Sequence, residues 1–171
     1  MQFFYNLGIM QNNRNPLIFI VEDNPVYNDL ISGVLKSNKY NNLRSFKSPE
    51  ECLKNIHLKP DIIVLNYAYT HFTGLDLMRK IHETKPDIEF IFLSAQNSIE
   101  VAVKIVRQGA FDYIVKNEKA PDKLISAISL AISRDKRKKI KRGLTLGAFL
   151  FFVLVVALIL LVFALYLFNL I

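Results

Sequence analysis

The chain has 171 residues and a formal net charge of +7, enough length for one ordinary domain and an appendage. Nearly all of the charge lies in residues 134–142, RDKRKKIKR, which hold 7 Lys and Arg against 1 Asp, whereas residues 1–133 hold 15 Lys and Arg against 14 Asp and Glu. The composition gives no basic nucleic-acid-binding face to the domain, and the single cysteine, Cys52, excludes an internal disulfide.

Residues 1–15 precede the first predicted strand and show no clear period. We expect a flexible leader there. The second methionine, Met10, raises the alternative that the protein starts at that residue.

Apolar, β-rich runs alternate with stretches of helical spacing through residues 16–133, the predicted domain. The predicted strands are residues 17–21, 42–46, 62–66, 88–94 and 111–115, and the predicted helices are residues 25–37, 48–57, 74–84, 98–108 and a fifth from about residue 121. Prolines lie near several helix starts, where their missing N–H costs nothing. The first, third and fourth strands are almost continuously apolar, which is typical of a parallel sheet covered on both faces. The predicted fold class is therefore α/β, doubly wound.

A doubly wound sheet binds its ligands outside the carboxyl ends of its strands. The polar residues predicted at those ends are Glu22 and Asp23 after the first strand, Asn66 at the third, Ser94 at the fourth and Lys116 after the fifth. We expect these residues to lie close together.

Several motifs match one family in order and on the expected strands. They are the acidic pair in IFIVEDNP, the glycine Gly74 eight residues after Asn66, the hydroxyl of Ser94 in FLSA, and GAFDYIVK with Tyr113 three residues before Lys116. Across residues 16–133 the chain thereby resembles the receiver domains of bacterial response regulators. The resemblance implies a five-stranded, flavodoxin-like parallel sheet of order 2-1-3-4-5.

The resemblance also implies roles for the site residues. The acidic pair, Glu22 and Asp23, would hold a divalent cation, and residue 66 occupies the position that accepts a phosphoryl group. Ser94 and Lys116 would contact the phosphoryl oxygens, and Tyr113 would report the state of the domain.

The chain departs from the family pattern at the acceptor, where Asn66 replaces aspartate, and Asn117 and Thr70 stand where prolines are usual. An acyl phosphate requires attack by an anionic carboxylate oxygen, and an amide oxygen is a much weaker nucleophile. We therefore expect no ordinary aspartyl phosphorylation at residue 66 and a domain that is not an enzyme.

A divalent cation such as Mg²⁺ would find hard oxygen ligands in Glu22, Asp23, the Asn66 amide and the backbone carbonyl near Ala68. Loss of one charge about 4 Å from the ion costs several kcal/mol at an effective dielectric near 20. The predicted affinity is much weaker than that of three carboxylates. Lys116 keeps the acidic pair as its partner, and the neutral residue 66 favours one arrangement of Ser94 and Tyr113 without a phosphoryl switch.

Other interpretations of these residues remain open. Glu22 and Asp23 also suit a solvated pair at a helix start, Ser94 suits a helix cap, although Ser98 is better placed for that role, and Tyr113 and Lys116 suit ordinary strand ends. The loop residues Tyr67, Tyr69, Thr70 and His71 are interpreted as contacts to a partner in preference to substitute nucleophiles.

Residues 143–171 contain no charged side chain, and residues 144–168 are apolar apart from Thr145, Tyr166 and small residues. A spanning helix needs about 20 apolar residues, so we predict a single C-terminal transmembrane helix. Residues 134–142 form a basic juxtamembrane segment that sets the topology and contacts anionic lipid. The predicted location is the inner (cytoplasmic) membrane, single-pass, with the domain in the cytoplasm.

Three functions follow as hypotheses. The leading one is a membrane-tethered pseudo-receiver, a binding module that presents its fourth helix, fifth strand and fifth helix to a histidine kinase or another signalling protein near the membrane. The second is a receiver that still undergoes metal-dependent phosphoryl transfer through an unconventional residue. The third is a scaffold that forms homo-oligomers through its transmembrane helix, for which Gly143 and Gly147 give only a weak motif.

Overall fold

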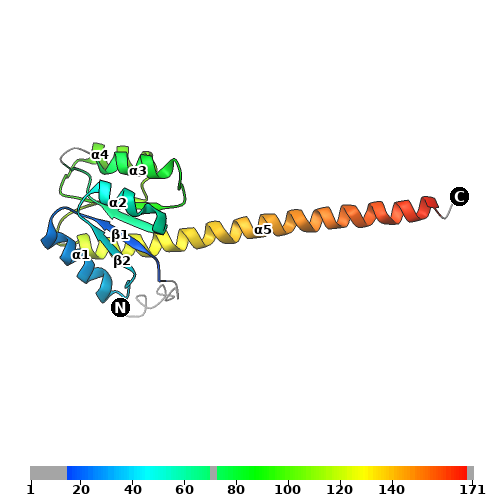
Figure 1. Cartoon of the computed structure of the whole chain (residues 1–171), viewed down its shortest axis with the longest axis horizontal. Coiled ribbons are helices and arrows are strands. Elements are labelled where there is room, and N and C mark those ends of the chain that lie inside the picture. The colour runs from blue at the N-terminus through cyan, green and yellow to red at the C-terminus, as the bar shows by residue number, and fades with distance from the viewer. Residues whose placement is uncertain (1–14, 70–72, 169–171) are drawn as a thin grey trace, which may run out of the picture. The chain divides into compact units, whose positions relative to one another are not determined.

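A computed structural model describes residues 15–69 and 73–168 (Figure 1). Most of the predicted leader, including Met10, lies outside the described residues, as do Thr70 and His71. The chain divides into two compact units, which meet in sequence between Ile132 and Ser133.

The first unit contains one parallel sheet of five strands. The strands are β1 (Ile18–Val21), β2 (Leu43–Phe46), β3 (Ile62–Leu65), β4 (Glu89–Ser94) and β5 (Asp112–Val115). They are arranged in the order β2-β1-β3-β4-β5. The register pairs Val21 with both Phe46 and Leu65, and Leu65 with Phe92, so the strand ends are aligned along one edge. The predicted fold class and strand order are confirmed.

The helices between the strands begin at residues suited to that position. They are α1 (Pro25–Ser37), α2 (Pro49–Asn55), α3 (Gly74–His82), α4 (Ile99–Arg107) and α5 (Ala120–Phe168), with a short 3₁₀ helix, η1 (Ile56–Leu58), after α2. The side chains of Asn24, Ser48, Thr73 and Ser98 each accept a hydrogen bond from a backbone N–H in the first turn. These bonds satisfy donors that have no partner inside the helix.

Side chains alternate between the two faces of the sheet, as the period of a strand requires. Figure 1 shows α1 and the start of α5 on one side of the sheet, and α2, α3 and α4 on the other. On the first side Ile31 and Leu35 of α1 and Leu124 and Ile128 of α5 pack on the strands. On the second side the buried residues include Phe19, Phe90, Phe92, Met78 and Ile105.

The second predicted helix is shorter than expected. We predicted a helix over residues 48–57, but α2 ends at Asn55 and continues as η1. Lys59 then takes a φ of 56°, the left-handed region that ends a helical turn. The chain can thereby turn into β3 three residues later.

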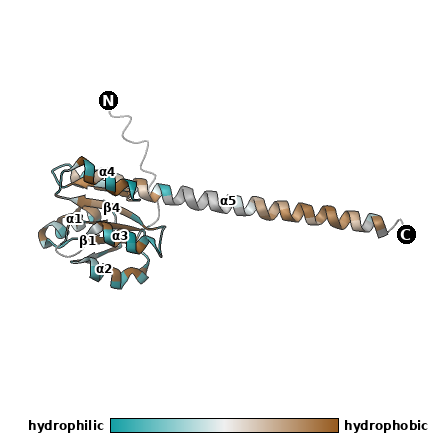
Figure 2. Cartoon of the chain, turned by 90° about the horizontal axis from the view of Figure 1, so that it is seen from above, coloured by the Kyte–Doolittle hydropathy of each residue, from teal (hydrophilic) through white to brown (hydrophobic). Residues whose placement is uncertain are grey.

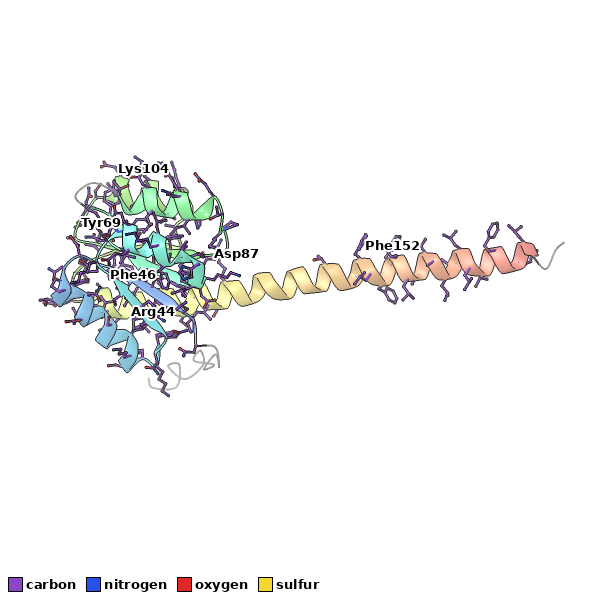
Figure 3. All side chains as sticks on the ribbon, viewed as in Figure 1. Arg44, Phe46, Tyr69, Asp87, Lys104 and Phe152 are labelled. Carbon is purple, nitrogen blue, oxygen red and sulfur yellow. The ribbon has the colours of Figure 1, made fainter. Side chains whose placement is uncertain are left out.

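The helix α5 includes the predicted fifth helix, the basic segment and the predicted span as far as Phe168, and residues 169–171 lie outside the described residues. Its segment Gly147–Ala164 is long and apolar enough to cross a membrane, judged by length and composition. The hydropathy colouring of this segment is predominantly brown in Figure 2, and its side chains, such as that of Phe152, stand out from the helix in Figure 3. None of this window is buried within the chain.

Candidate functional site

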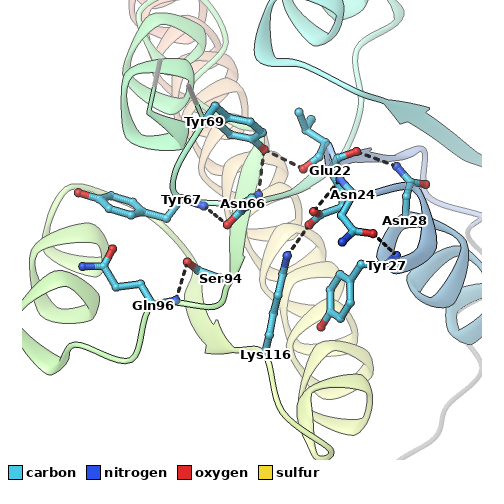
Figure 4. Close-up of polar contacts among 11 residues, drawn as sticks. Glu22, Asn24, Tyr27, Asn28, Asn66, Tyr67, Tyr69, Ser94, Gln96 and Lys116 are labelled. Carbon is cyan, nitrogen blue, oxygen red and sulfur yellow. Dashed lines mark hydrogen bonds and ion pairs between the residues drawn. The ribbon is translucent and has the colours of Figure 1, made fainter. Parts of the chain in front are cut away.

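The carboxyl ends of β1, β3, β4 and β5 bring most of the predicted site residues together (Figure 4). An ion pair at their centre joins Lys116 Nζ to Glu22 Oε2 at 2.7 Å. The two residues are 94 positions apart in sequence, and both side chains are largely buried, at 15% and 5% exposure. The prediction that Lys116 keeps a partner in the acidic pair is confirmed for Glu22.

Glu22 makes a second contact through its other oxygen, because Oε1 accepts a hydrogen bond from the backbone N–H of Asn24 at 3.2 Å. Both oxygens therefore have partners within the domain. Asp23 is exposed. Neither residue belongs to the first turn of α1, because that helix is capped by Asn24 and its first turn contains no acidic residue.

The Lys116 ammonium also lies over the aromatic ring of Tyr27, 4.2 Å from its centroid. A cation over an aromatic face is stabilised by the ring quadrupole, more strongly when it is desolvated. Burial, followed by the nearby Glu22 carboxylate, raises the pKa of the Tyr27 hydroxyl. Tyr27 therefore remains neutral at physiological pH, and its ring packs against the ammonium group of Lys116.

Asn66 directly follows β3, as predicted, and its side chain is engaged locally. Its Oδ1 accepts a hydrogen bond from the backbone N–H of Tyr67 at 2.8 Å. Its own backbone N–H donates to the hydroxyl oxygen of Tyr69 at 3.0 Å and to the carbonyl of Val21 at 3.2 Å. The side chain and the backbone N–H of Asn66 thus both stabilise the first residues of the loop after β3.

Tyr69 points into the domain (Figure 4). Its hydroxyl donates to the carbonyl oxygen of Val21 at 2.8 Å while accepting from Asn66. Burial raises the pKa of this hydroxyl, and the Glu22 and Asp23 carboxylates add to the increase. The expectation that Tyr69 faces a partner is wrong for its hydroxyl, because the backbone groups at the ends of β1 and β3 provide it with partners inside.

Gly74 is required by the close approach of α3 to the end of β3. A Cβ atom built on Gly74 would overlap the backbone carbonyl oxygen of Asn66 and lie 3.0 Å from the Phe92 ring. The Gly74 N–H also donates to the carbonyl of Tyr67 at 2.8 Å. The glycine eight residues after Asn66 therefore shapes the backbone of the site.

Ser94 and Tyr113 both hold the loop that follows β4. Ser94 is buried, and its Oγ accepts from the backbone N–H of Gln96 at 3.2 Å. The Tyr113 hydroxyl donates to the carbonyl oxygen of Gln96 at 2.7 Å, while its ring stacks on Phe92 with centroids 6.4 Å apart. Ser98, the better cap candidate, does cap α4.

The sequence model of one family, described as the response regulator receiver domain, matches residues 18–129. The match covers more than half of the chain and every residue of the site. The chain belongs to the receiver family. As a receiver domain it is a component of two-component signalling, in which receivers interact with histidine kinases and other signalling proteins.

Individual relatives agree with this membership. The receiver is 33% identical over 81 residues to the regulatory protein LuxO of Vibrio cholerae, an alignment that covers 47% of this chain and 18% of LuxO. It is 28% identical over 129 residues to the response regulator protein TmoT of Ectopseudomonas mendocina, covering 75% of this chain and 58% of TmoT. The chain therefore spans less than two thirds of either relative.

A solved structure shows the same fold. The signal receiver domain of a putative LuxO repressor protein from Vibrio parahaemolyticus superposes with a TM-score of 0.67 at 23% identity, over 73% of this chain and 95% of that one. The likeness at this identity concerns the fold alone.

A divalent cation needs several oxygen ligands. In this conformation both oxygens of Glu22 and the Oδ1 of Asn66 accept hydrogen bonds or face Lys116, whereas Asp23 is exposed. Among the described residues, no group of three or more His, Cys, Asp or Glu side chains could hold a metal.

The sequence indicated the polar residues of the site and Tyr113, but it indicated neither Tyr27 as a neighbour of Lys116 nor the inward direction of Tyr69. Tyr27 lies in the first turn of α1, and Tyr69 lies three residues after Asn66. The position of Tyr69 in the loop after the third strand suggested a side chain that faces outward to a partner. In the structure its hydroxyl faces inward instead.

Proposed function

We propose that this receiver is a membrane-tethered pseudo-receiver, a non-enzymatic module that binds a signalling protein at the membrane without ordinary aspartyl phosphorylation. The observation that carries the proposal is Asn66 at the end of β3, at the acceptor position of the family. An amide there provides no anionic oxygen to attack phosphorus.

The alternative of phosphoryl transfer to an unconventional residue has a weak candidate in Tyr69. Its hydroxyl is engaged in two hydrogen bonds, and burial raises its pKa, so that deprotonation to a nucleophile is disfavoured. The burial of the Tyr69 hydroxyl also limits the access of a phosphodonor to it. These features support the binding module over the enzyme.

The proposed docking face consists of α4, β5 and the start of α5. On α4 the side chains of Ile99, Val103 and Val106 are exposed at 81%, 44% and 45%. An open groove beside them is lined by Ala102, Val103, Val106, Arg107, Asp112 and Tyr113. Apolar side chains at the centre of a surface with a charged rim are typical of protein interfaces.

Tyr113 links this face to the site. Its ring contributes to the groove, and its hydroxyl holds the loop after β4 through Gln96. A partner that contacts the groove would therefore contact a residue anchored next to Ser94, so the conformation of the site would be presented at the docking face.

The membrane tether is supported by the apolar window Gly147–Ala164 and by the cations that precede it. Residues 134–142 carry 7 Lys and Arg, and such clusters favour the cytoplasmic side and anionic headgroups. The lipid bilayer is thus a second proposed partner, and the proposed place of the receiver is the cytoplasmic side of the inner membrane.

The phosphorylation part of the proposal is tested with Mg²⁺ and a small phosphodonor. The native chain is expected to gain no base- and hydroxylamine-labile phosphoryl group, whereas Asn66→Asp is expected to gain one, because the new carboxylate supplies both a nucleophile and a third charge for the cation. Phosphorylation of the native chain under these conditions would contradict the proposal.

The docking face is tested by capture of partners from membranes, followed by mass spectrometry. The double variant Val103→Glu, Val106→Glu puts charge into the groove and should lose the specific partner. Val26→Glu is the matched control, because Val26 is 77% exposed on α1, away from this face. Loss of the partner in the control and retention in the α4 variant would place the binding surface elsewhere.

A further inference from the structure

The positive charge inside the degenerate site comes from a side chain. Lys116 Nζ lies 2.7 Å from Glu22 Oε2 and 4.2 Å from the Tyr27 ring centroid, and only 15% of the Lys116 side chain is exposed. A buried carboxylate is costly unless it is paired. Because Lys116 pairs with Glu22, the site does not require a metal ion to balance that charge.

The hydroxyl of Tyr69 joins three parts of the site that are otherwise connected only along the sheet. It donates to Val21 at the end of β1, accepts from Asn66 at the end of β3, and belongs to the loop that follows. Ala68, in the same loop, forms an isolated antiparallel bridge with Thr73. The backbone near the Ala68 carbonyl is therefore held in a defined position without any ligand.

We propose that Lys116 and Tyr69 form an internal latch that replaces the divalent cation of the receiver site and holds the domain in one conformation. Lys116 supplies the charge, and Tyr69 ties the ends of β1 and β3 to the loop. The latch deepens the proposed function, on which it rests, because a module that does not switch by phosphorylation presents its docking face in a constant shape.

The charge half of the latch is tested by Mn²⁺ binding to the full chain in a non-ionic detergent, measured by the loss of the free-ion electron paramagnetic resonance signal. The native chain is expected to bind at least about tenfold more weakly than Lys116→Met, because removal of the ammonium leaves Glu22 and Asp23 without a cation. Lys119→Met removes an exposed lysine from the same segment and should behave like the native chain. Native binding as tight as that of Lys116→Met would overturn this half.

The hydroxyl half is tested by hydrogen–deuterium exchange of peptides that contain residues 66–69. Tyr69→Phe removes only the hydroxyl and is expected to raise exchange there about tenfold, because the loop loses its bond to the Val21 carbonyl and the Asn66 N–H keeps only its longer bond to that carbonyl. Tyr67→Phe is the matched control in the same loop, with a half-buried ring. Equal exchange in the native chain and in both variants would overturn the latch.

These measurements use neither a phosphodonor nor a partner protein. Phosphorylation of the native chain would contradict the proposed function while leaving the Mn²⁺ and exchange results to decide the latch. Conversely, tight Mn²⁺ binding by a native chain that cannot be phosphorylated would remove the latch and leave the binding module.

Discussion

Gly74 controls how closely α3 approaches the end of β3. Gly74→Ala is expected to lower the free energy of unfolding by about 2 kcal/mol, because the new methyl group overlaps the Asn66 carbonyl and the backbone must move. Gly33→Ala is the matched control, since a Cβ at Gly33 meets nothing within 4 Å and the position is exposed within α1. The free energy of unfolding of the control should rise by up to about 1 kcal/mol, because alanine has a higher helix propensity than glycine.

Cys52 provides the measurement for these variants. It is fully buried, and burial raises the pKa of its thiol to about 12, so the folded chain should not react with a maleimide. Alkylation as a function of denaturant then reports unfolding of the first unit without interference from other thiols, because the chain has one cysteine. A Gly74→Ala midpoint equal to that of the native chain would contradict the steric argument.

At the scale of a single element, α3 depends on a reciprocal cap. The Thr73 side chain accepts from the Asp76 N–H, and the Asp76 carboxylate accepts from the Thr73 N–H. The hydrogen bond from the Thr73 hydroxyl lowers the pKa of Asp76 below 3.8, with smaller help from Arg79. Thr73→Ala is expected to lower the free energy of unfolding by about 1 kcal/mol, because α3 loses its N-cap.

The lowered pKa gives this cap a defined pH dependence. A carboxyl group that is more acidic in the folded state contributes stability above its unfolded pKa of 3.8 and loses it as the pH falls through the folded value. Asp76→Asn should therefore be less stable than the native chain at pH 7, with the difference shrinking below pH 3.8. In a Thr73→Ala background the pH-dependent difference should be reduced, and an unchanged difference would show that Thr73 is not its cause.

Most elements were predictable because their signals are local. Apolar runs, prolines near helix starts and the cap candidate Ser98 place the strands and helices within a few residues. The length of α2 was less predictable, because its end depends on the backbone turn at Lys59. The long α5 joins two segments that the charge pattern separated.

The site was predictable only as far as its strand ends. Alignment of those ends brings Glu22 and Lys116 together, and the resemblance gives their positions in advance. The inward direction of Tyr69 was not predictable, because it depends on which carbonyl and N–H the loop brings within reach of the hydroxyl. Contacts of this kind belong to the folded backbone and have no periodic signature.

For the molecule as a whole, the proposed span predicts that the chain fractionates with membranes and resists extraction by salt. High salt should not release the protein, because an inserted helix does not depend on surface charges that salt screens over about 10 Å at 0.1 M. Protease added outside intact cells should leave the receiver uncut. These outcomes are measured by immunoblotting of the membrane and soluble fractions.

The control for this experiment is the double variant Leu154→Arg, Leu158→Arg within the window Gly147–Ala164. Each arginine near the centre of a span costs about 3 kcal/mol on insertion, so the variant should appear in the soluble fraction. Release of the native chain by salt alone would show that the basic residues, and not the apolar helix, hold it at the membrane.

The position of β5 at the edge of the sheet has a consequence for local unfolding. In the part of the chain that the structure describes, β5 pairs with β4 alone, and three of its four residues are partly buried, whereas β1, β3 and β4 are buried throughout. Segments with fewer buried contacts open at a lower free energy than the centre of a domain. We therefore expect the α4 and β5 side of the receiver to open locally at a lower free energy than the central strands. The native shape of the proposed docking face is unchanged, but its local stability is separate from that of the core.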